Sequence, residues 1–152
     1  MICFSKYHGC GNDFIIVSEK EVVDSNYSEL ATKICNRNTG VGADGFIVVG
    51  ENPLEMIFYN ADGSRAPMCG NGIRCFAKYC FDKGIRNESE YKVLTLAGEM
   101  GVKVISENPF VVEIDMGKPD FTPIKCGIKT DKEDFLKQNI ETNTGKHLVS
   151  LS

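Results

Sequence analysis

One cysteine in this sequence lies where its thiol could take part in proton transfer. Cys69 comes immediately before the strongest helical pattern of the chain, and Gly70 and Gly72 follow it. Backbone N–H groups in the first turn of a helix lack partners, and together with the helix dipole they stabilise a thiolate there. The glycines would let a carboxylate approach the same N–H groups. From spacing alone, a small buried cysteine in a tight loop explains the pattern equally well.

The helix that must position Cys69 is predicted by apolar residues at i, i+3, i+4, i+7 and i+8, followed by Gly84 as a stop signal. These apolar residues are Ile73, Phe76, Ala77, Cys80 and Phe81. A shorter helix is expected after Asn26, where Glu29 completes a capping box. Strands are expected over residues 2–7, 14–18, 46–49, 55–59, 91–96, 101–105 and 110–115.

Glycine and proline in Met116-Gly117-Lys118-Pro119 end the last strand pattern and mark a domain boundary. We therefore expect a main domain over residues 1–116 and a linker with the start of a second lobe over residues 117–152. Within the second segment we expect a helix over Asp131–Gln138 and a strand starting over Leu148–Leu151. Because about 35 residues are too few to hold a core unaided, we expect this chain to be part of a longer protein.

The stretch Gly40-Val41-Gly42-Ala43-Asp44-Gly45 matches the G-x-G-x-x-G pattern of dinucleotide-binding loops. That loop needs a strand before it and a helix after it, and here the order is reversed. We interpret it as a turn from helix to strand.

Composition narrows the classes of partner. The 152 residues carry a formal net charge of −4 without a basic block, which favours small molecules or proteins over nucleic acid or anionic membranes. Seven cysteines without any C-x-x-C pair give no zinc-ligand spacing, so we expect no metal. The amino terminus has no apolar signal-peptide region, and we expect a reduced, cytoplasmic protein.

Three ordered motifs carry a family resemblance. His8-Gly9-Cys10-Gly11-Asn12-Asp13-Phe14, the Gly40–Gly45 stretch and the segment from Asn60 through Cys69-Gly70-Asn71-Gly72 to Cys75 resemble the amino-terminal half of diaminopimelate epimerase. The resemblance implies an α+β fold, in which a lobe of β-strands wraps around a central helix at about residues 70–82. It also implies a cofactor-free, pyridoxal-independent isomerase that interconverts the LL and meso forms of 2,6-diaminopimelate in lysine and peptidoglycan-precursor biosynthesis.

The resemblance assigns roles by position. Cys69 matches the first of two catalytic cysteines, Gly70 and Asn71 would give N–H groups to the substrate's α-carboxylate, and Asn12 and Asn60 match substrate-binding asparagines. From the residues alone, turn formation explains both asparagines. The family's second cysteine, in an Ala-Cys-Gly-Thr-Gly or similar segment, does not occur in these 152 residues. We therefore expect the chain to be inactive alone, with the carboxy-terminal lobe as its missing partner; a homodimer of the full-length enzyme stays open.

Two other functions remain open at this stage. A racemase of another amino acid would use the same chemistry with a different side-chain pocket. A non-catalytic protein that binds carboxylates would keep the helix N-terminus without the second base. A cysteine–histidine hydrolase is a weaker alternative, because spacing places neither His8 nor His147 beside Cys69.

Overall fold

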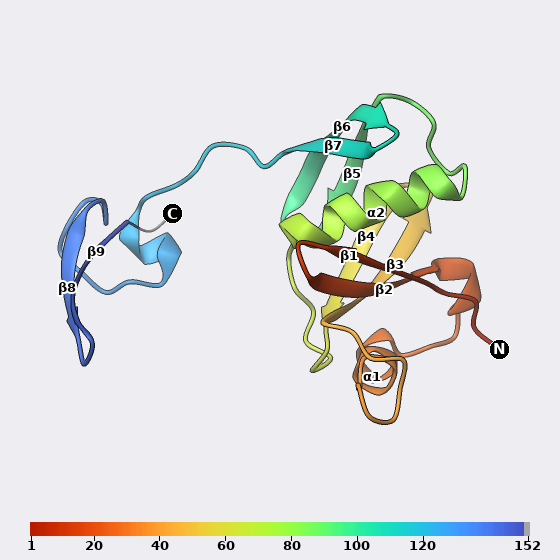
Figure 1. Cartoon of the computed structure of the whole chain (residues 1–152), viewed down its shortest axis with the longest axis horizontal. Coiled ribbons are helices and arrows are strands. Elements are labelled where there is room, and N and C mark those ends of the chain that lie inside the picture. Colours follow the sequence, from red (N-terminus) through yellow and green to blue (C-terminus); the bar gives the residue numbers. More distant parts are fainter. Residues whose placement is uncertain (151–152) are drawn as a thin grey trace. The chain divides into compact units, whose positions relative to one another are not determined.

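The computed structural model describes residues 1–150, without the side chain of Cys126. The chain divides into two compact units, Met1–Met116 and Gly117–Ser152, and each is described by itself. Figure 1 shows the ribbon of the whole chain with its elements labelled. The predicted strands of the first unit are all present, with ends shifted by a few residues; the first begins at Ser5 rather than Ile2.

The first unit is built on a mixed sheet with the strand order β1-β2-β3-β4-β5-β6-β7. Its strands are β1 (Ser5–Gly9), β2 (Asn12–Ser18), β3 (Gly45–Glu51), β4 (Leu54–Asn60), β5 (Glu90–Thr95), β6 (Gly98–Glu107) and β7 (Phe110–Asp115). The pairs β2–β3 and β4–β5 are parallel and the other pairs are antiparallel. Parallel neighbours need a crossover, and helices α1 (Tyr27–Ile34) and α2 (Gly70–Asp82) supply the two crossovers.

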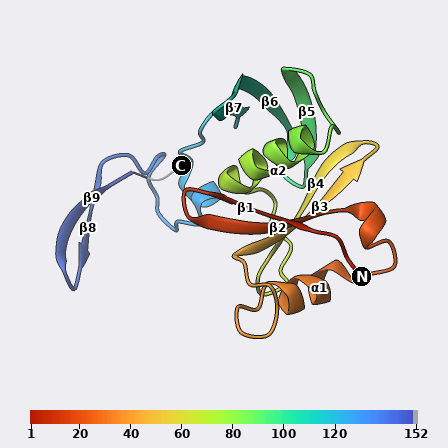
Figure 2. The same cartoon turned by 45° about the vertical axis from the view of Figure 1, so that its right-hand side comes forward.

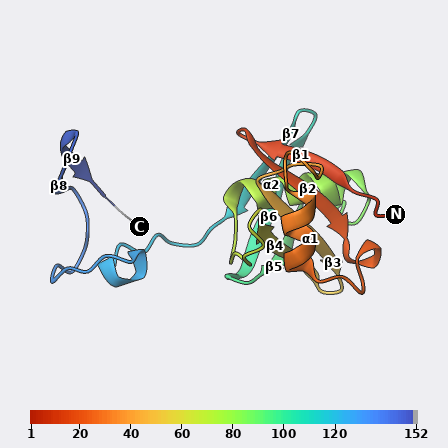
Figure 3. The ribbon, with the colours of Figure 1, turned by 90° about the horizontal axis from the view of Figure 1, so that it is seen from below.

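Strands β2 and β3 are buried on both faces because the consecutive residues 14–17 and 46–49 are all apolar. In β2, Phe14 and Ile16 belong to the cluster that packs with α2, whereas Ile15 and Val17 belong to the cluster that packs with α1. Successive strand residues point to opposite faces, which explains the alternation. The sheet curves into a half-barrel, and Figure 2 shows α2 in its hollow, where it contacts β1, β2, β3 and β7. Figure 3 shows α1 on the outer side, against β3 and β4.

Both predicted helices have the expected ends. The Asn26 side chain accepts the N–H groups of Ser28 and Glu29, so the predicted N-cap is confirmed. The second bond of the pair differs from a standard capping box, because Glu29 Oε1 accepts from the Asn26 side chain at 3.2 Å rather than from its backbone N–H. Helix α2 covers the predicted residues 70–82, and Gly84 follows it with a φ of 66° and donates to the Phe81 carbonyl at 3.1 Å. The left-handed backbone at this point explains the glycine.

The second unit holds a short 3-10 helix, η2 (Pro123–Cys126), and a two-stranded sheet of β8 (Gln138–Thr142) and β9 (Gly145–Val149). The helix predicted over Asp131–Gln138 is wrong, because residues 131–137 form bends and irregular backbone and Gln138 begins β8. Phe135 and Leu136 are the only apolar residues of that segment and they are adjacent, so no apolar stripe exists for a helix to bury. Of the predicted strand, Leu148 and Val149 lie in β9, whereas Leu151 lies outside the described residues.

Candidate functional site

Cys69 is the N-cap of α2, as its position in the sequence predicts. Its backbone is extended, with φ −141° and ψ 117°, and its Sγ accepts the N–H of Gly72 at 3.3 Å. Its carbonyl accepts the N–H of Ile73 at 2.8 Å, which is the first hydrogen bond of the helix. The thiol is therefore half-buried at the positive end of the helix dipole.

The turn between β1 and β2 brings Asn12 to Cys69 across 57 positions of sequence. Asn12 Nδ2 lies 3.9 Å from Cys69 Sγ and can donate to it. Cys10 and Gly11 have φ values of 56° and 83°, and this left-handed pair folds the chain back sharply enough to place Asn12 at the start of β2. Asn12 is thus the predicted site residue that the structure places against the thiol.

Gly70 and Asn71 present the first-turn N–H groups that the sequence predicts as carboxylate donors. A Cβ on Gly70 would have no neighbour nearer than the Met116 methyl group at 4.0 Å, so the backbone is open at this point. The Asn71 side chain is engaged, because its Oδ1 accepts from Arg74, and Arg74 also donates to the Gly70 carbonyl at 3.0 Å. The backbone of Asn71 is therefore the part suited to a ligand.

The sequence suggests that Gly72 is a glycine so that a ligand can approach the backbone closely. The structure shows a different reason, which is tight packing. A Cβ at Gly72 would lie 3.2 Å from Cys69 Cβ, 3.4 Å from Ile47 Cδ1 and 3.5 Å from Cys69 Sγ. The buried backbone of Gly72 packs directly beneath Cys69. This glycine makes room for the cysteine side chain.

Asn60 serves the turn after β4. Its Nδ2 donates to Ser64 Oγ at 2.9 Å, and its backbone N–H donates to the Ser64 carbonyl at 2.9 Å. Gly63, with φ 84°, donates to the Asn60 carbonyl at 3.0 Å and closes the turn. The structure thus shows Asn60 in the turn-forming arrangement, with its side chain bound to Ser64 rather than to Cys69.

The other described cysteines differ from Cys69 in environment. Cys3 and Cys10 are exposed, and Cys35, Cys75 and Cys80 are buried. Burial raises the pKa of the Cys35 and Cys75 thiols to about 11 and that of Cys80 to about 12. Such thiols stay protonated near neutral pH and are poor proton acceptors.

The contacts among charged residues around the Gly40–Gly45 turn were not predicted from the sequence. The turn lies between α1 and β3, so the interpretation as a helix-to-strand turn is confirmed. Asp44 within it contacts Arg37 and Asp13, and Asp13 directly follows Asn12. The sequence signal for this contact is an aspartate in each of two glycine-rich turns. An Asp side chain in a tight turn commonly hydrogen-bonds to nearby backbone N–H groups.

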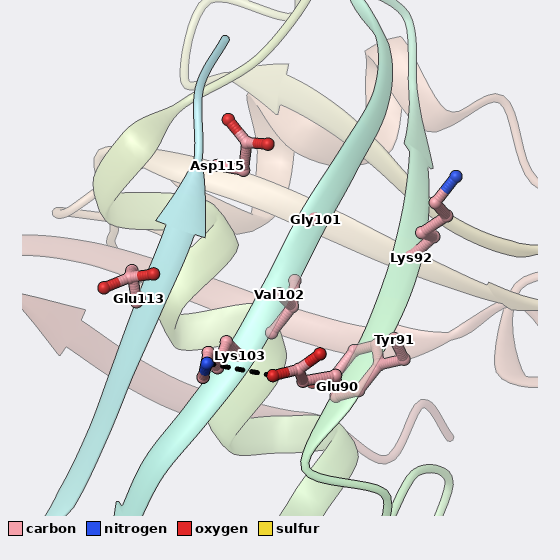
Figure 4. A pocket seen from close by; sticks show the side chains of 8 residues that line it. All are labelled: Glu90, Tyr91, Lys92, Gly101, Val102, Lys103, Glu113 and Asp115. Carbon is pink, nitrogen blue, oxygen red and sulfur yellow. Dashed lines mark ion pairs between the residues drawn. The ribbon is translucent and has the colours of Figure 1, made fainter.

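A cavity of about 590 Å³ lies on β5, β6 and β7 and is shown in Figure 4. Its charged lining includes Lys103 and Glu90, whose side chains form an ion pair at 3.0 Å. None of the predicted site residues lines it. This cavity is therefore separate from the candidate site.

Within residues 1–150, no helix has the length and apolar character needed to cross a membrane. Among the described side chains, no group of three or more His, Cys, Asp or Glu residues is arranged to hold a metal ion.

The fold and the site define a mixed-sheet α+β domain with a cysteine at the N-terminus of its inner helix. The family model for diaminopimelate epimerase matches residues 4–122, and the chain belongs to the diaminopimelate epimerase family.

Curated relatives extend the match over most of the chain. The diaminopimelate epimerase of Caldanaerobacter subterraneus subsp. tengcongensis is 45% identical over 152 residues, covering 97% of this chain and 55% of the relative. The diaminopimelate epimerase of Methanocella arvoryzae is 45% identical over 130 residues, covering 82% and 46% of the two chains. This chain spans about half the length of these relatives.

A solved methylitaconate-delta-isomerase superposes with a TM-score of 0.59 at 13% identity, covering 98% of this chain and 49% of the isomerase. At this identity the likeness concerns the fold alone.

Proposed function

We propose that this chain is the amino-terminal lobe of an enzyme that interconverts LL- and meso-2,6-diaminopimelate. Membership of the diaminopimelate epimerase family supports the substrate. The observation that carries the proposal is Cys69 at the N-cap of α2, with Asn12 Nδ2 at 3.9 Å from its sulfur. This arrangement offers a thiol for proton transfer beside backbone donors for a carboxylate.

The reaction inverts one carbon centre, so a proton must leave one face and another must arrive on the opposite face. In one direction the Cys69 thiolate takes the α-proton and becomes a thiol, while a thiol from the other lobe gives its proton to the opposite face and becomes a thiolate. The first-turn N–H groups of Gly70 and Asn71 hold the α-carboxylate, onto which the carbanion's charge is delocalised. No cofactor is needed in this scheme.

The two asparagines receive separate roles in the proposal. Asn12 donates a hydrogen bond to the sulfur of Cys69, and a bond of this kind is stronger to a thiolate than to a thiol. Asn60 donates its Nδ2 hydrogen to Ser64, and we assign its Oδ1 to the substrate's ammonium group. Both residues lie on the first unit and would orient the substrate before the second lobe closes the site.

The remaining features follow from the same proposal. In the full-length protein the strands of each lobe would wrap around a central helix, which here is α2 (Gly70–Asp82). The enzyme would act in the cytoplasm, in lysine and peptidoglycan-precursor biosynthesis, with a second lobe that supplies the other cysteine. The match to about half of each relative supports that second lobe.

The first test is to read the coding sequence beyond Ser152 for a second cysteine flanked by glycine. The full-length protein is then incubated with LL-diaminopimelate in D₂O, and NMR follows meso product and α-deuterium. We expect Cys69→Ala to lower the rate by about a hundredfold or more, the usual worth of an acid/base group. Cys3→Ala, at an exposed cysteine, serves as the control and leaves the rate unchanged. Turnover of another amino acid but not of diaminopimelate would contradict the substrate assignment.

A further inference from the structure

Asp13 and Asp44 hold each other through reciprocal backbone hydrogen bonds. The N–H of Asp13 donates to Asp44 Oδ2 at 3.1 Å, and the N–H of Asp44 donates to Asp13 Oδ1 and to the Asp13 carbonyl, both at 3.0 Å. The start of β2 and the turn before β3 are thereby locked together. Two carboxylates this close repel each other unless cations neutralise them.

Arg37 supplies much of that neutralisation. Its guanidinium donates to both carboxylate oxygens of Asp13, at 2.7 and 3.2 Å, and to Asp44 Oδ1 at 2.8 Å. Lys6 lies 3.1 Å from Asp13 and donates to the Gly42 carbonyl at 2.6 Å. Two cations and two carboxylates thus form a closed network, and the Asp13 side chain is only 17% exposed. Fork geometry of this kind fixes orientation as well as distance.

The network adjoins both asparagines of the candidate site. Asp13 directly follows Asn12, whose amide reaches the sulfur of Cys69. The Asp44 carbonyl accepts the N–H of Ala61 at 3.3 Å, and the next residue, Gly45, pairs with Asn60 in the β3–β4 ladder. Displacement of Asp13 or Asp44 therefore moves the backbone that carries Asn12 and Asn60.

We propose that Arg37 is a positioning residue that sets Asn12 against Cys69 by clamping Asp13 to Asp44. The catalytic meaning of this role rests on the proposed function, but the geometric role does not. It is therefore tested on the 152-residue chain without diaminopimelate. The two proposals can fail independently.

The test compares rates of iodoacetamide modification at Cys69. Trypsin cuts after Arg65 and Arg74, and the resulting peptide contains Cys69 as its one cysteine, so mass spectrometry quantifies this thiol separately. In a variant that lacks Arg65 the peptide spans residues 38–74, and Cys69 is still its one cysteine. The reacting form is the thiolate, and an amide donates a stronger hydrogen bond to a thiolate than to a thiol. Because Asn12→Ala removes the amide that donates to Cys69, we expect it to slow the reaction. Arg37→Gln is expected to slow it as well, by about two- to tenfold, the change that one ordinary hydrogen bond is worth. Arg37→Lys, which keeps the charge and loses the fork, should restore part of the rate.

Arg65→Gln is the matched control, because Arg65 also forms a surface ion pair, with Glu55 at 3.3 Å. This variant should leave the modification rate of Cys69 unchanged. Urea unfolding shows whether each variant is folded. If Arg37→Gln does not fold, Arg37→Lys replaces it in the comparison of rates. The decisive readout is the double variant: if Arg37 acts through Asn12, Arg37→Gln adds no further slowing to Asn12→Ala. Additive effects, or an unchanged rate in folded Arg37→Gln, would overturn the proposal.

Discussion

The sulfur of Cys69 accepts the backbone N–H of Gly72 at 3.3 Å, so the candidate acid/base group is also the cap of its own helix. A thiolate accepts hydrogen bonds more strongly than a thiol. The charge on the sulfur and the hydrogen bonding of the first turn of α2 are therefore linked. Loss of the proton strengthens the cap, and gain of the proton weakens it.

Gly72→Ala is expected to displace Cys69. The new Cβ would lie 3.2 Å from Cys69 Cβ and 3.4 Å from Ile47 Cδ1, in a packed region. Overpacking of this kind costs about 1–3 kcal/mol, which outweighs the better helix propensity of alanine. Urea unfolding measures the loss of stability, and the alkylation rate of Cys69 reports the displacement.

Gly70→Ala is the control for Gly72→Ala, because a Cβ there has no neighbour nearer than 4.0 Å. It should be neutral or raise stability by up to about 1 kcal/mol, in line with helix propensity. Equal losses in the two variants would contradict the packing role of Gly72.

Much of the fold could be predicted because local signals and burial agree. The α2 stripe around Phe76 and the Asn26 capping box are local patterns, and the structure confirms both helices. The helix prediction over Asp131–Gln138 is wrong because the charged residues of this segment suit a helix, whereas its two apolar residues form no stripe that a helix could bury. No periodicity shows which side of β2 faces α2, because both faces are apolar.

Only those features of the candidate site that lie within one continuous segment could be predicted from the sequence. The helix pattern alone places Cys69 at an N-cap, and the structure agrees. Its contact with Asn12 spans 57 positions, and the clamp by Arg37 on Asp13 spans 24, so neither follows from local spacing. The packing of Gly72 beneath Cys69 likewise depends on Ile47 from a distant strand.

The described thiols should react with iodoacetamide in an order set by burial. At about pH 8, Cys3 and Cys10 should react first because they are exposed, and the half-buried Cys69 should follow. With a pKa of about 11, a buried thiol such as Cys75 is only about one-thousandth ionised at that pH, and its sulfur is also shielded. Peptide mass spectrometry over time gives the order. Rapid native-state labelling of Cys75 or Cys80 would contradict the burial of α2.

The free energy of unfolding should fall at alkaline pH. Burial raises the pKa of Cys80 from its ordinary value of 9.0 to about 12, so the folded state holds this proton more tightly than the unfolded chain. The resulting stability is fully present below about pH 9 and is lost as the pH rises toward 12. Urea midpoints measured against pH show the slope. Cys80→Ala should cost about 1–2 kcal/mol at neutral pH through its lost packing, yet show a shallower alkaline slope.

The ion-pair network around Arg37 should make the free energy of unfolding depend on pH in the acidic range. Hydrogen bonds from Arg37 hold the pKa of the Asp13 carboxyl well below its usual range. The lowered pKa means that Asp13 contributes stability above about pH 4, and that this contribution is lost as the pH falls. Arg37→Gln should therefore be less stable than the unsubstituted chain at neutral pH, and the gap should narrow in acid. The stability difference between Arg65→Gln and the unsubstituted chain should be smaller. If the difference for Arg37→Gln instead widens as the pH falls, Arg37 does not hold the charged form of Asp13.

The 152-residue chain alone should not invert diaminopimelate, although the proposed full-length enzyme does. Inversion needs a second acid/base group on the opposite face, and the described thiols are unsuited to that task. Cys75 and Cys80 are buried in the same helix that Cys69 caps, and Cys3 and Cys10 lie exposed. Without a second lobe, water would also screen the N–H groups of the first turn. LL-diaminopimelate in D₂O, followed by NMR, separates the outcomes: exchange without inversion would support Cys69 as a lone base, whereas inversion near the full-length rate would overturn the two-lobe proposal.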